Sequence, residues 1–455
     1  MIEINMKNKR DVLNFLRQEK DVKFIRVIFP DVLGRAMNFC FPSEKMESVF
    51  ERGIGFDGSS VQGFARIEES DLIIMPDPKT FCVLPWNYET PQNLTWKEAV
   101  VFGDIFNSKG KHYEGDSRYI LKKELNRTKK FGSLFVGPEL EFFIFQDNTK
   151  PKLLDSGGYF YGGKWGKIRK AVQIYLSQMG VKTECDHHEV APSQHEINLR
   201  YNDALNIADS ITLAKYIIKR TTEKMGLFAS FMPKPITKVN GSGMHLHLSL
   251  WKKDKNLFFR SEKNPLSILA KQYLTGLIKH GQEIQLILNQ WVNSYKRLIP
   301  GYEAPVYLAW GQKNRSAYIR IPQTHLKEAE KATRIEIRSP DPACNIYLTL
   351  ALIQAAGTQG IKENLKFSSP EEKDIFEMTK QEMEKKNIKI LASNLKQSME
   401  RFQKSRLTRR TLGKHLFQKI IQNKEIEWQK YEKTVGKRFK KQVSPYEIKE
   451  YLPIL

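Results

Sequence analysis

The sequence predicts an α+β protein made of two unequal domains. Residues 8–19 place apolar side chains at helical spacing, and residues 24–30 and 37–41 are typical of strands joined by an Asp-Val-Leu-Gly turn. We expect residues 1–106 to form this small unit and residues 107–455 to form a larger second domain. Three stretches of the larger domain alternate polar with apolar residues, as strands do when one of their faces lines a polar cavity.

The composition is that of a globular protein, since hydrophobic residues make up 40% and aromatic residues 11% of the 455 residues. The apolar runs are too short to cross a bilayer, and the first residues lack the basic start and apolar stretch of a signal peptide. Four scattered cysteines without metal-site spacing are typical of a reducing compartment. We therefore expect a cytoplasmic protein without a membrane partner.

The net charge of +23 is unevenly distributed along the chain. Residues 401–455 carry 15 Lys and Arg against 5 Asp and Glu, whereas residues 1–105 carry 13 against 16. A basic C-terminal region can bind nucleic acid or an acidic partner. A solvated, lysine-rich helical surface explains the same charge, and no nucleic-acid-binding motif accompanies it. We therefore favour the solvated surface and do not expect nucleic acid as a partner.

Two carboxylates stand out in the predicted strand over residues 137–145. Glu139 and Glu141 point to the same side, about 7 Å apart, because side chains alternate between the two faces of a strand. They lie in an aromatic run that is expected to be buried. Buried carboxylates repel each other and lose hydration unless cations lie beside them. The pair therefore indicates a cation-binding site.

Two later stretches repeat the alternation. One carries His245, His247 and Ser249 between leucines, and the other carries Arg334, Glu336 and Arg338 between isoleucines. A single polar strand face is ordinarily just solvated, and this interpretation stays open for each strand taken alone. Three such strands in one domain predict a shared polar cavity.

A further cluster of ligand-type residues spans residues 187–196. Pro192 prevents one continuous helix, so we expect Glu189 and Glu196 on two strand edges joined by a bend. The two adjacent histidines at 187 and 188 raise the alternative of zinc. Zinc prefers closed tetrahedral sets of His and Cys, whereas a carboxylate-rich cluster favours Mg²⁺ or Mn²⁺.

The remaining polar features suit anions. Residues 240–243 form a tight loop whose backbone N–H groups can hold an anion, and arginines such as Arg297 and Arg320 suit carboxylates and phosphates, although each alone is more often a surface ion-pair partner. The chain has no G-x-x-x-x-G-K-[ST] loop, no G-x-S-x-G elbow and no kinase motif set. Divalent ions on Glu oxygens with nearby arginines favour a metal-dependent phosphoryl-transfer enzyme of another fold.

Seven motifs occur in order along the chain: FDGSS at 56–60, GPELEFF at 137–143, HHEVAP at 187–192, NGSGMH at 240–245, NSYKRLIPGYEAP at 293–305, NRS at 314–316 and RIEIRSPDP at 334–342. Together they resemble the type I glutamine synthetases of bacteria and archaea over essentially the whole length. The resemblance implies a small β-grasp-like N-terminal domain and a large catalytic domain with a curved antiparallel sheet and surrounding helices. It also implies a dodecamer of two stacked hexamers, with each active site shared between neighbouring subunits.

The activity implied by the resemblance is the ATP-dependent ligation of ammonium to the γ-carboxylate of L-glutamate through γ-glutamyl phosphate, which gives L-glutamine, ADP and phosphate. The resemblance also implies that two or more Mg²⁺ or Mn²⁺ ions take part in this reaction as cofactors. The matching motifs assign one ion to Glu141, Glu189 and Glu196 and a second to Glu139, His245 and Glu336. They assign glutamate binding to Asn240, Gly241, Arg297, Glu303, Arg315 and Arg338, the ammonium pocket to Asp57, Ser60, Tyr159 and Glu189, and ATP binding to His247, Ser249, Arg320 and Arg334. Asp57, Glu303 and Arg315 would be catalytic, with Asp57 as general base and Glu303 on a flap that closes over glutamate.

Departures from the family pattern leave alternatives open. Tyr161 stands where the family commonly has Asp, beside the implied ammonium pocket. This keeps open a γ-glutamyl–amine ligase, which would use another amine as nucleophile. A non-catalytic scaffold is disfavoured because all six implied metal ligands are present. Residues 63–71 resemble the subgroup inhibited by its product, so we hypothesise glutamine feedback through Arg66.

Overall fold

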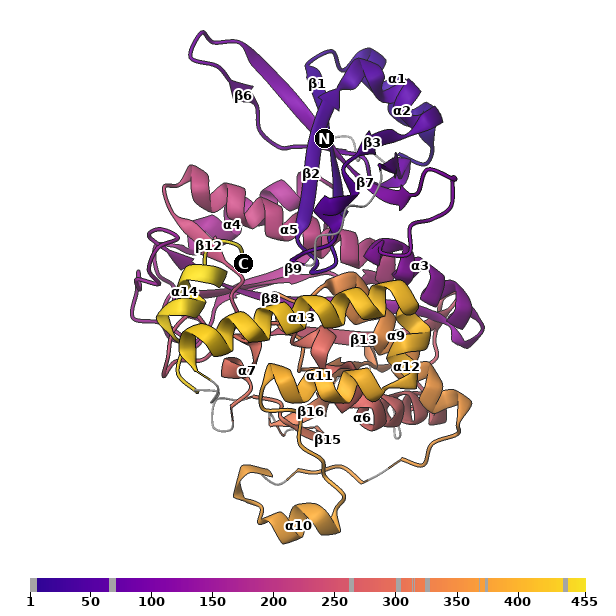
Figure 1. The fold of residues 1–455 in the computed structure, drawn as a ribbon, viewed down its shortest axis with the longest axis vertical. Helices are drawn as coiled ribbons and strands as arrows, with labels where there is room; N and C mark the ends of the chain where they lie inside the picture. The colour runs from indigo at the N-terminus through magenta and orange to yellow at the C-terminus, as the bar shows by residue number, and fades with distance from the viewer. Residues whose placement is uncertain are drawn as a thin grey trace.

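A computed structural model describes residues 6–64, 71–261, 266–299, 304–312, 314, 316–323, 328–367, 369–372, 375–436 and 441–455 of the chain. A small sheet with its own helices lies at one end of the molecule, and a larger sheet surrounded by helices forms the remainder (Figure 1). Within the described residues, no helix is both long and apolar enough to cross a membrane.

Among the described residues, the small sheet has seven strands, in the order β2-β1-β7-β4-β3, with β5 and β6 also paired to β7. The strands are β1 (Val22–Pro30), β2 (Ala36–Pro42), β3 (Ile54–Phe56), β4 (Leu72–Pro76), β5 (Cys82–Val83), β6 (Tyr88–Glu89) and β7 (Thr95–Phe106). β1 and β7 run parallel at the centre, and the other pairs are antiparallel. The predicted helix and the two predicted strands of this region are confirmed.

Two helices, α1 (Lys9–Gln18) and α2 (Met46–Arg52), cover this sheet. Asn8 caps α1 by accepting from the Asp11 backbone N–H, while the Asp11 carboxylate accepts from the Asn8 N–H. Val12 of α1 and Phe50 of α2 are buried in one hydrophobic cluster with Val101 of β7. The small domain therefore has a core of its own.

Within the part of the chain that the structure describes, the large sheet has ten strands. Seven of them follow the order β15-β16-β17-β13-β8-β10-β9, while β11 and β12 pair with β8 and β14 pairs with β13. The strands are β8 (Ser133–Phe145), β9 (Thr183–His188), β10 (Gln194–Leu199), β11 (Asn202–Asp203), β12 (Phe228–Ser230), β13 (Met244–Lys252), β14 (Lys255–Asn256), β15 (Tyr307–Gly311), β16 (Ala317–Arg320) and β17 (Ile335–Ile337). All pairs are antiparallel except β15 with β16. The sheet is therefore antiparallel, as expected, apart from this pair at its edge, and the α+β fold class is confirmed.

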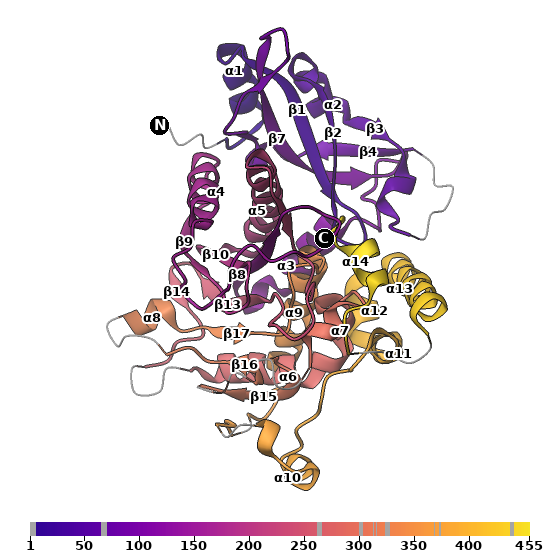
Figure 2. The ribbon, with the colours of Figure 1, turned by 90° about the vertical axis from the view of Figure 1, so that its left-hand side faces the viewer.

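Helices surround this sheet on several sides (Figure 2). They are α3 (Ser117–Thr128), α4 (Gly166–Gln178), α5 (Ala204–Lys224), α6 (Ile268–Leu288), α7 (Ser294–Arg297), α8 (Ala329–Ala332), α9 (Ile346–Lys362), α10 (Lys380–Lys385), α11 (Leu395–Lys404), α12 (Arg406–Leu412), α13 (Lys414–Val435) and α14 (Pro445–Tyr451). α4 and α5 lie between the two sheets, and α11 to α14 gather on one side of the large domain.

The helices α6 and α9 cross closely in the large core because glycines meet at the crossing. A Cβ on Gly276 would lie 2.3 Å from the Ala356 carbonyl oxygen, and one on Gly360 would lie 2.2 Å from the Gln272 carbonyl oxygen. Any side chain at either position would push the helices apart. The crossing thus brings two largely apolar helices into backbone contact.

A buried arginine joins the two domains. Arg118 of α3 is 1% exposed and forms ion pairs with Asp77 and Asp104 of the small domain, at 2.9 and 2.7 Å. It also pairs with Asp209 of α5 at 2.9 Å, and Asp209 accepts a hydrogen bond from Tyr347 at 2.8 Å. One guanidinium therefore neutralises carboxylates from both domains.

We predict that Arg118→Met lowers the free energy of unfolding by about 3–5 kcal/mol, because it leaves buried carboxylates without their cation. Arg17→Met is the matched control, since Arg17 and Glu47 form a solvent-exposed pair 4.0 Å apart, and it should cost about 0–1 kcal/mol. Denaturant titration followed by tryptophan fluorescence measures both. Equal losses in the two variants would contradict the role given to Arg118.

Candidate active site

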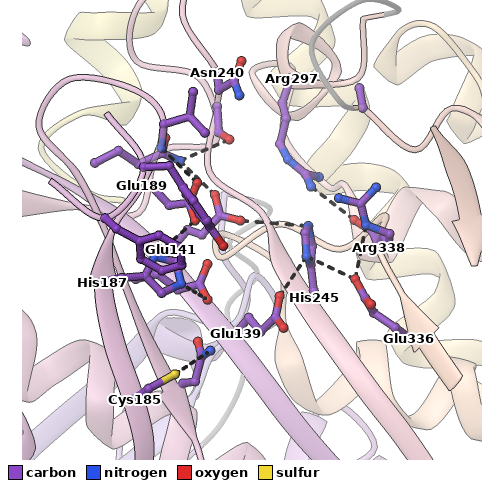
Figure 3. A pocket seen from close by; sticks show the side chains of 18 of the residues that line it. Glu139, Glu141, Cys185, His187, Glu189, Asn240, His245, Arg297, Glu336 and Arg338 are labelled. Carbon is purple, nitrogen blue, oxygen red and sulfur yellow. Dashed lines mark hydrogen bonds and ion pairs between the residues drawn. The ribbon is translucent and has the colours of Figure 1, made fainter. Parts of the chain in front are cut away.

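The polar face of the large sheet is assembled around β8. Its neighbours β13 and β10 place His245 opposite Glu139 and Glu196 opposite Glu141. Side chains of directly opposed residues lie about 5 Å apart on the same face of a sheet. The alternation seen in the sequence therefore brings two cross-strand pairs together, and Figure 3 shows Glu139, Glu141 and His245 close to one another.

The outer strands extend the same face. β17 places Glu336 opposite His247, and β16 places Arg320 opposite Glu336. On the other side, β9 places His187 opposite Glu196. Polar side chains from six strands, β16, β17, β13, β8, β10 and β9, thus form one continuous surface.

A cavity of about 340 Å³ opens on this surface. Its lining residues are Glu139, Glu141, Tyr159, Phe160, Cys185, His187, Glu189, Val190, Gln194, Glu196, Asn198, Asn240, Gly241, His245, Arg297, Ala304, Arg320, Glu336 and Arg338. Acidic and basic side chains share the lining, so the cavity can accept cations and anions side by side (Figure 3).

One cluster of ligand-type atoms joins Glu139, His245 and Glu336. Nδ1 of His245 lies 3.0 Å from Oε2 of Glu139 and 3.4 Å from Oε1 of Glu336. Burial raises the pKa of Glu139, but hydrogen bonds to His245 and His247 outweigh it and hold that pKa well below its usual range. The cluster therefore keeps its carboxylates ionised, as a divalent cation requires.

A second cluster joins His187, Glu189 and Glu196, with Glu141 beside it. Nε2 of His187 lies 3.2 Å from Glu196, and its Nδ1 lies 3.5 Å from Glu189. Burial, followed by the charges of Glu189 and Glu196, raises the pKa of Glu141 well above its usual range. Burial and the Glu196 charge raise the pKa of Glu189 to about 7. These carboxylates repel one another, and a divalent cation would remove that repulsion.

Both clusters fit divalent cations by their donor atoms. In each, one ligand atom from each of three residues lies within 4.8 Å of the others. The donors are mostly carboxylate oxygens, with one imidazole per cluster, which suits Mg²⁺ or Mn²⁺ better than a closed zinc site.

A third His and Asp cluster lies behind the second one. Nη1 of Arg169 is 2.6 Å from Nδ1 of His195. Since arginine can only donate, Nδ1 accepts and the other ring nitrogen of His195 carries the proton, so this histidine cannot bind a metal there. His188 contacts Asp155 through Nε2 at 3.1 Å and the Glu189 carbonyl oxygen through Nδ1 at 2.7 Å. The third cluster therefore supports the turn that carries Glu189.

Arginines line the opposite part of the cavity. Nε of Arg320 and Nε of Arg338 lie 2.6 and 3.2 Å from the Glu336 carboxylate. Arg297 donates from its guanidinium to the Ser339 carbonyl oxygen at 2.9 Å, which fixes its orientation. Burial lowers the pKa of Arg297, opposed by the nearby Glu141 carboxylate. Buried guanidinium groups at a cavity wall suit an anionic substrate.

Most of the residues expected at the site meet in this cavity. Those that line it are Glu139, Glu141, Tyr159, Glu189, Glu196, Asn240, Gly241, His245, Arg297, Arg320, Glu336 and Arg338. Those that do not are Asp57, Ser60, His247, Ser249 and Arg334. Glu303, Arg315 and Arg66 lie outside the described residues.

The expected residues that do not line the cavity fall into two groups. Arg334 donates to Nδ1 of His247 at 3.1 Å, and His247 reaches Glu139 at 2.8 Å, so this pair lies directly beside the first cluster. Asp57, by contrast, belongs to the small domain, where its carboxylate accepts from the Ser59 backbone N–H at 2.9 Å. Within one chain, Asp57 is not part of the cavity lining.

Several lining residues were not predicted. His187 contributes to the second cluster, and Gln194 donates to Glu141 at 2.8 Å. Gln194 and Asn198 lie two residues before and after Glu196 on β10, so the period of two could have found both. His187 could not be assigned in this way, because its place follows from the register between β9 and β10.

A small sheet joined to a larger sheet with this mixed polar face defines a two-domain α+β protein whose candidate active site brings carboxylates and guanidinium groups together in one cavity. Two family models cover almost the whole chain: the glutamine synthetase β-grasp domain matches residues 21–108, and the glutamine synthetase catalytic domain matches residues 114–451. The chain belongs to the glutamine synthetase family.

Individual relatives agree with the family models. A glutamine synthetase of Methanosarcina mazei is 43% identical over 456 residues, which cover 98% of each chain. One of Thermotoga maritima is 42% identical over 445 residues, which cover 96% of this chain and 97% of its own. The Plasmodium falciparum glutamine synthetase structure is 26% identical with a TM-score of 0.82 and covers 99% of this chain and 100% of its own. A GmaS structure with ADP is 27% identical with a TM-score of 0.82, covering 97% and 99%.

We predict that Mn²⁺ affinity for the second cluster rises with pH through about 7, the pKa of Glu189. A group with a raised pKa is partly protonated near neutral pH and must lose its proton to bind a cation, so affinity changes roughly tenfold per pH unit below that pKa. Calorimetry in buffers of different ionisation enthalpy measures affinity and proton release together. Glu189→Gln is the control and should reduce this release without abolishing it, because Glu141 beside the cluster also has a raised pKa; release that persists unchanged would contradict the assignment.

Proposed function

We propose that the chain is a glutamate–ammonia ligase, which uses ATP to join ammonium to the γ-carboxylate of L-glutamate through γ-glutamyl phosphate. The observation that carries this proposal is the meeting of two carboxylate and histidine clusters with Arg297, Arg320 and Arg338 in one cavity. Similarity to glutamine synthetases over nearly the full length of the chain, at 43% and 42% identity, supports the same substrates.

The γ-carboxylate of glutamate must be activated because a carboxylate is a poor electrophile. Transfer of a phosphoryl group from ATP activates it by forming the acyl phosphate. Two or more Mg²⁺ or Mn²⁺ ions at the two clusters would offset the charge of the transferring phosphoryl group. Arg297 and Arg338, with Arg315, hold the glutamate carboxylates and the phosphoryl oxygens, and Asn240 and Gly241 lie on the amino-acid side. His247, Ser249, Arg320 and Arg334 hold the nucleotide.

Ammonium must bind among negative groups and then lose a proton before it attacks the acyl carbon. Glu189 and Tyr159 line the cavity on this side, and Asp57 is the proposed general base, with Ser60 beside it. Since Asp57 is not in the lining of its own chain's cavity, we propose that a neighbouring subunit supplies it, in a dodecamer of two stacked hexamers. Glu303 closes the flap that keeps water from the acyl phosphate. The boundary between residues 106 and 107 and a cytoplasmic location belong to the same proposal.

The competing γ-glutamyl–amine ligase rests on Tyr161, which is 45% exposed and contacts the ring of His188 at 5.7 Å between centroids. A tyrosine at the expected Asp position leaves this loop less acidic. The cavity itself keeps Glu189 and Tyr159, so ammonium remains the better fit.

The first test measures phosphate release from ATP with L-glutamate and Mg²⁺, comparing ammonium with a panel of primary amines. We expect turnover with ammonium, glutamine as product and a loss of roughly 10²–10⁴-fold in Asp57→Ala, the range for a general base. Ser48→Ala is a control on the surface of the small domain, where Ser48 donates to the nearby Lys45 carbonyl oxygen at 2.9 Å. Turnover with an amine alone would identify the other ligase, and none from a folded oligomer would indicate a scaffold.

A second test addresses regulation. If Arg66 carries product feedback, Arg66→Ala should keep its turnover but resist inhibition by L-glutamine. Glutamine titrations of the wild type and the variant at fixed glutamate give the inhibition constants. Identical inhibition constants for L-glutamine in the wild type and in Arg66→Ala would contradict the hypothesis.

A further inference from the structure

Three buried polar residues connect the C-terminal helix α14 to α7, the helix that carries Arg297 at the cavity. Asn293, Lys296 and Glu447 are each 0% exposed, and we call them the polar hub. Glu447 belongs to α14, whereas Lys296 lies in α7 and Asn293 directly precedes it. Within the described residues, the hub is therefore a contact between segments about a third of the chain apart.

The contacts of Glu447 reach both other members. Its Oε2 lies 3.4 Å from Nζ of Lys296, and its Oε1 accepts from the side-chain amide of Asn293 at 3.0 Å. The same carboxylate accepts from the Ser444 backbone N–H at 2.9 Å and so closes the capping box of α14. Lys296 also donates to the Gln442 carbonyl oxygen at 2.9 Å. The end of the chain is thus held to α7 by side chains at several points.

The hub also holds the loop that carries Asn240 and Gly241. The Asn293 side chain donates to the Lys234 carbonyl oxygen at 2.9 Å and accepts from the Lys234 N–H at 2.7 Å. The carbonyl oxygen of Pro233, the residue before Lys234, accepts from the Ser242 N–H at 2.8 Å. Asn293 therefore holds the N-terminal end of the loop at Lys234, and the hydrogen bond between Ser242 and Pro233 holds the C-terminal end of the loop to the N-terminal end.

Arg297 meets this loop at Gly241. A Cβ on Gly241 would lie 2.3 Å from the Pro233 carbonyl oxygen and 3.3 Å from Cβ of Arg297. Arg297 directly follows Lys296 in α7. A shift of the hub would therefore move the guanidinium of Arg297 and the Asn240 loop relative to each other.

Buried ion pairs of this kind contribute little net stability, because desolvation offsets the attraction between the charges. Their geometry is nonetheless specific, since each donor and acceptor must keep its partner. We propose that the hub, through Glu447, sets the distance between Arg297 and the Asn240–Gly241 loop and thereby the affinity for the amino-acid substrate. Glu447 is then a positioning residue at the C-terminal end, and this role rests on the proposed function because glutamate is the substrate invoked.

The test is steady-state glutamine formation by the full-length oligomer, with KM measured separately for L-glutamate and ATP. In Glu447→Gln, an amide nitrogen faces Lys296 and the Ser444 N–H, which are themselves donors. We expect KM for glutamate to rise roughly tenfold, as for one lost charged hydrogen bond, with KM for ATP unchanged within about twofold. Glu447→Asp keeps the charge and should restore part of the loss.

Glu124→Gln is the matched control, because Glu124 of α3 is 3% exposed and pairs with Arg127. It undergoes the same chemical change and should leave both KM values as in the wild type. If Glu447→Gln does not fold, Asn293→Ala replaces it, since it releases Lys234 without leaving a charge unpaired, and the same split in KM is expected.

The outcomes separate the two proposals. Unchanged KM for glutamate in a folded Glu447 or Asn293 variant, or equal rises for glutamate and ATP, overturns the role of the hub. A wild-type protein that forms no glutamine overturns the proposed function. A rise confined to glutamate, absent from Glu124→Gln and partly reversed in Glu447→Asp, supports the hub.

Discussion

The crowding of carboxylates on one face of β8 is the constraint on which the rest of the site depends. Glu139 and Glu141 are held on adjacent same-face positions of a strand whose other face is core, so they cannot move apart. Each is compensated differently: Glu139 by two histidines, and Glu141 by the Gln194 amide and the Gly243 N–H at 2.8 and 2.9 Å. Neighbouring strands must therefore supply donors at fixed positions.

The same alternation fixes the register of those strands from the opposite face. Leu140 of β8 and Leu246 of β13 are fully buried in the large core, while Glu139 and His245 face the cavity. A slip by one residue would place a leucine in the cavity and a charge in the core. Hydrophobic burial on one face of these strands thus holds the polar clusters on the other face in place.

The alternation and the composition were enough to predict β8, the two-domain α+β arrangement and the existence of a shared polar cavity. They could not supply His187, since its place depends on how β9 pairs with β10. Nor could they supply Glu447, which lies in a charged C-terminal region that we interpreted as a solvated surface. That interpretation was wrong for Lys424, which is 1% exposed and pairs with Glu427 at 2.9 Å. Charge counts do not reveal which charges are buried.

Glu336 stands where the two halves of the cavity meet. Its carboxylate belongs to the first cluster through His245 and pairs at the same time with Arg320 and Arg338. A cation bound to the Glu336 carboxylate would weaken the ion pairs of Glu336 with the two guanidinium groups, because the same oxygens would contact the cation and the arginines. The arginines are then better able to bind phosphoryl or carboxylate oxygens. Through this one side chain, we expect cation binding and anion binding to strengthen each other.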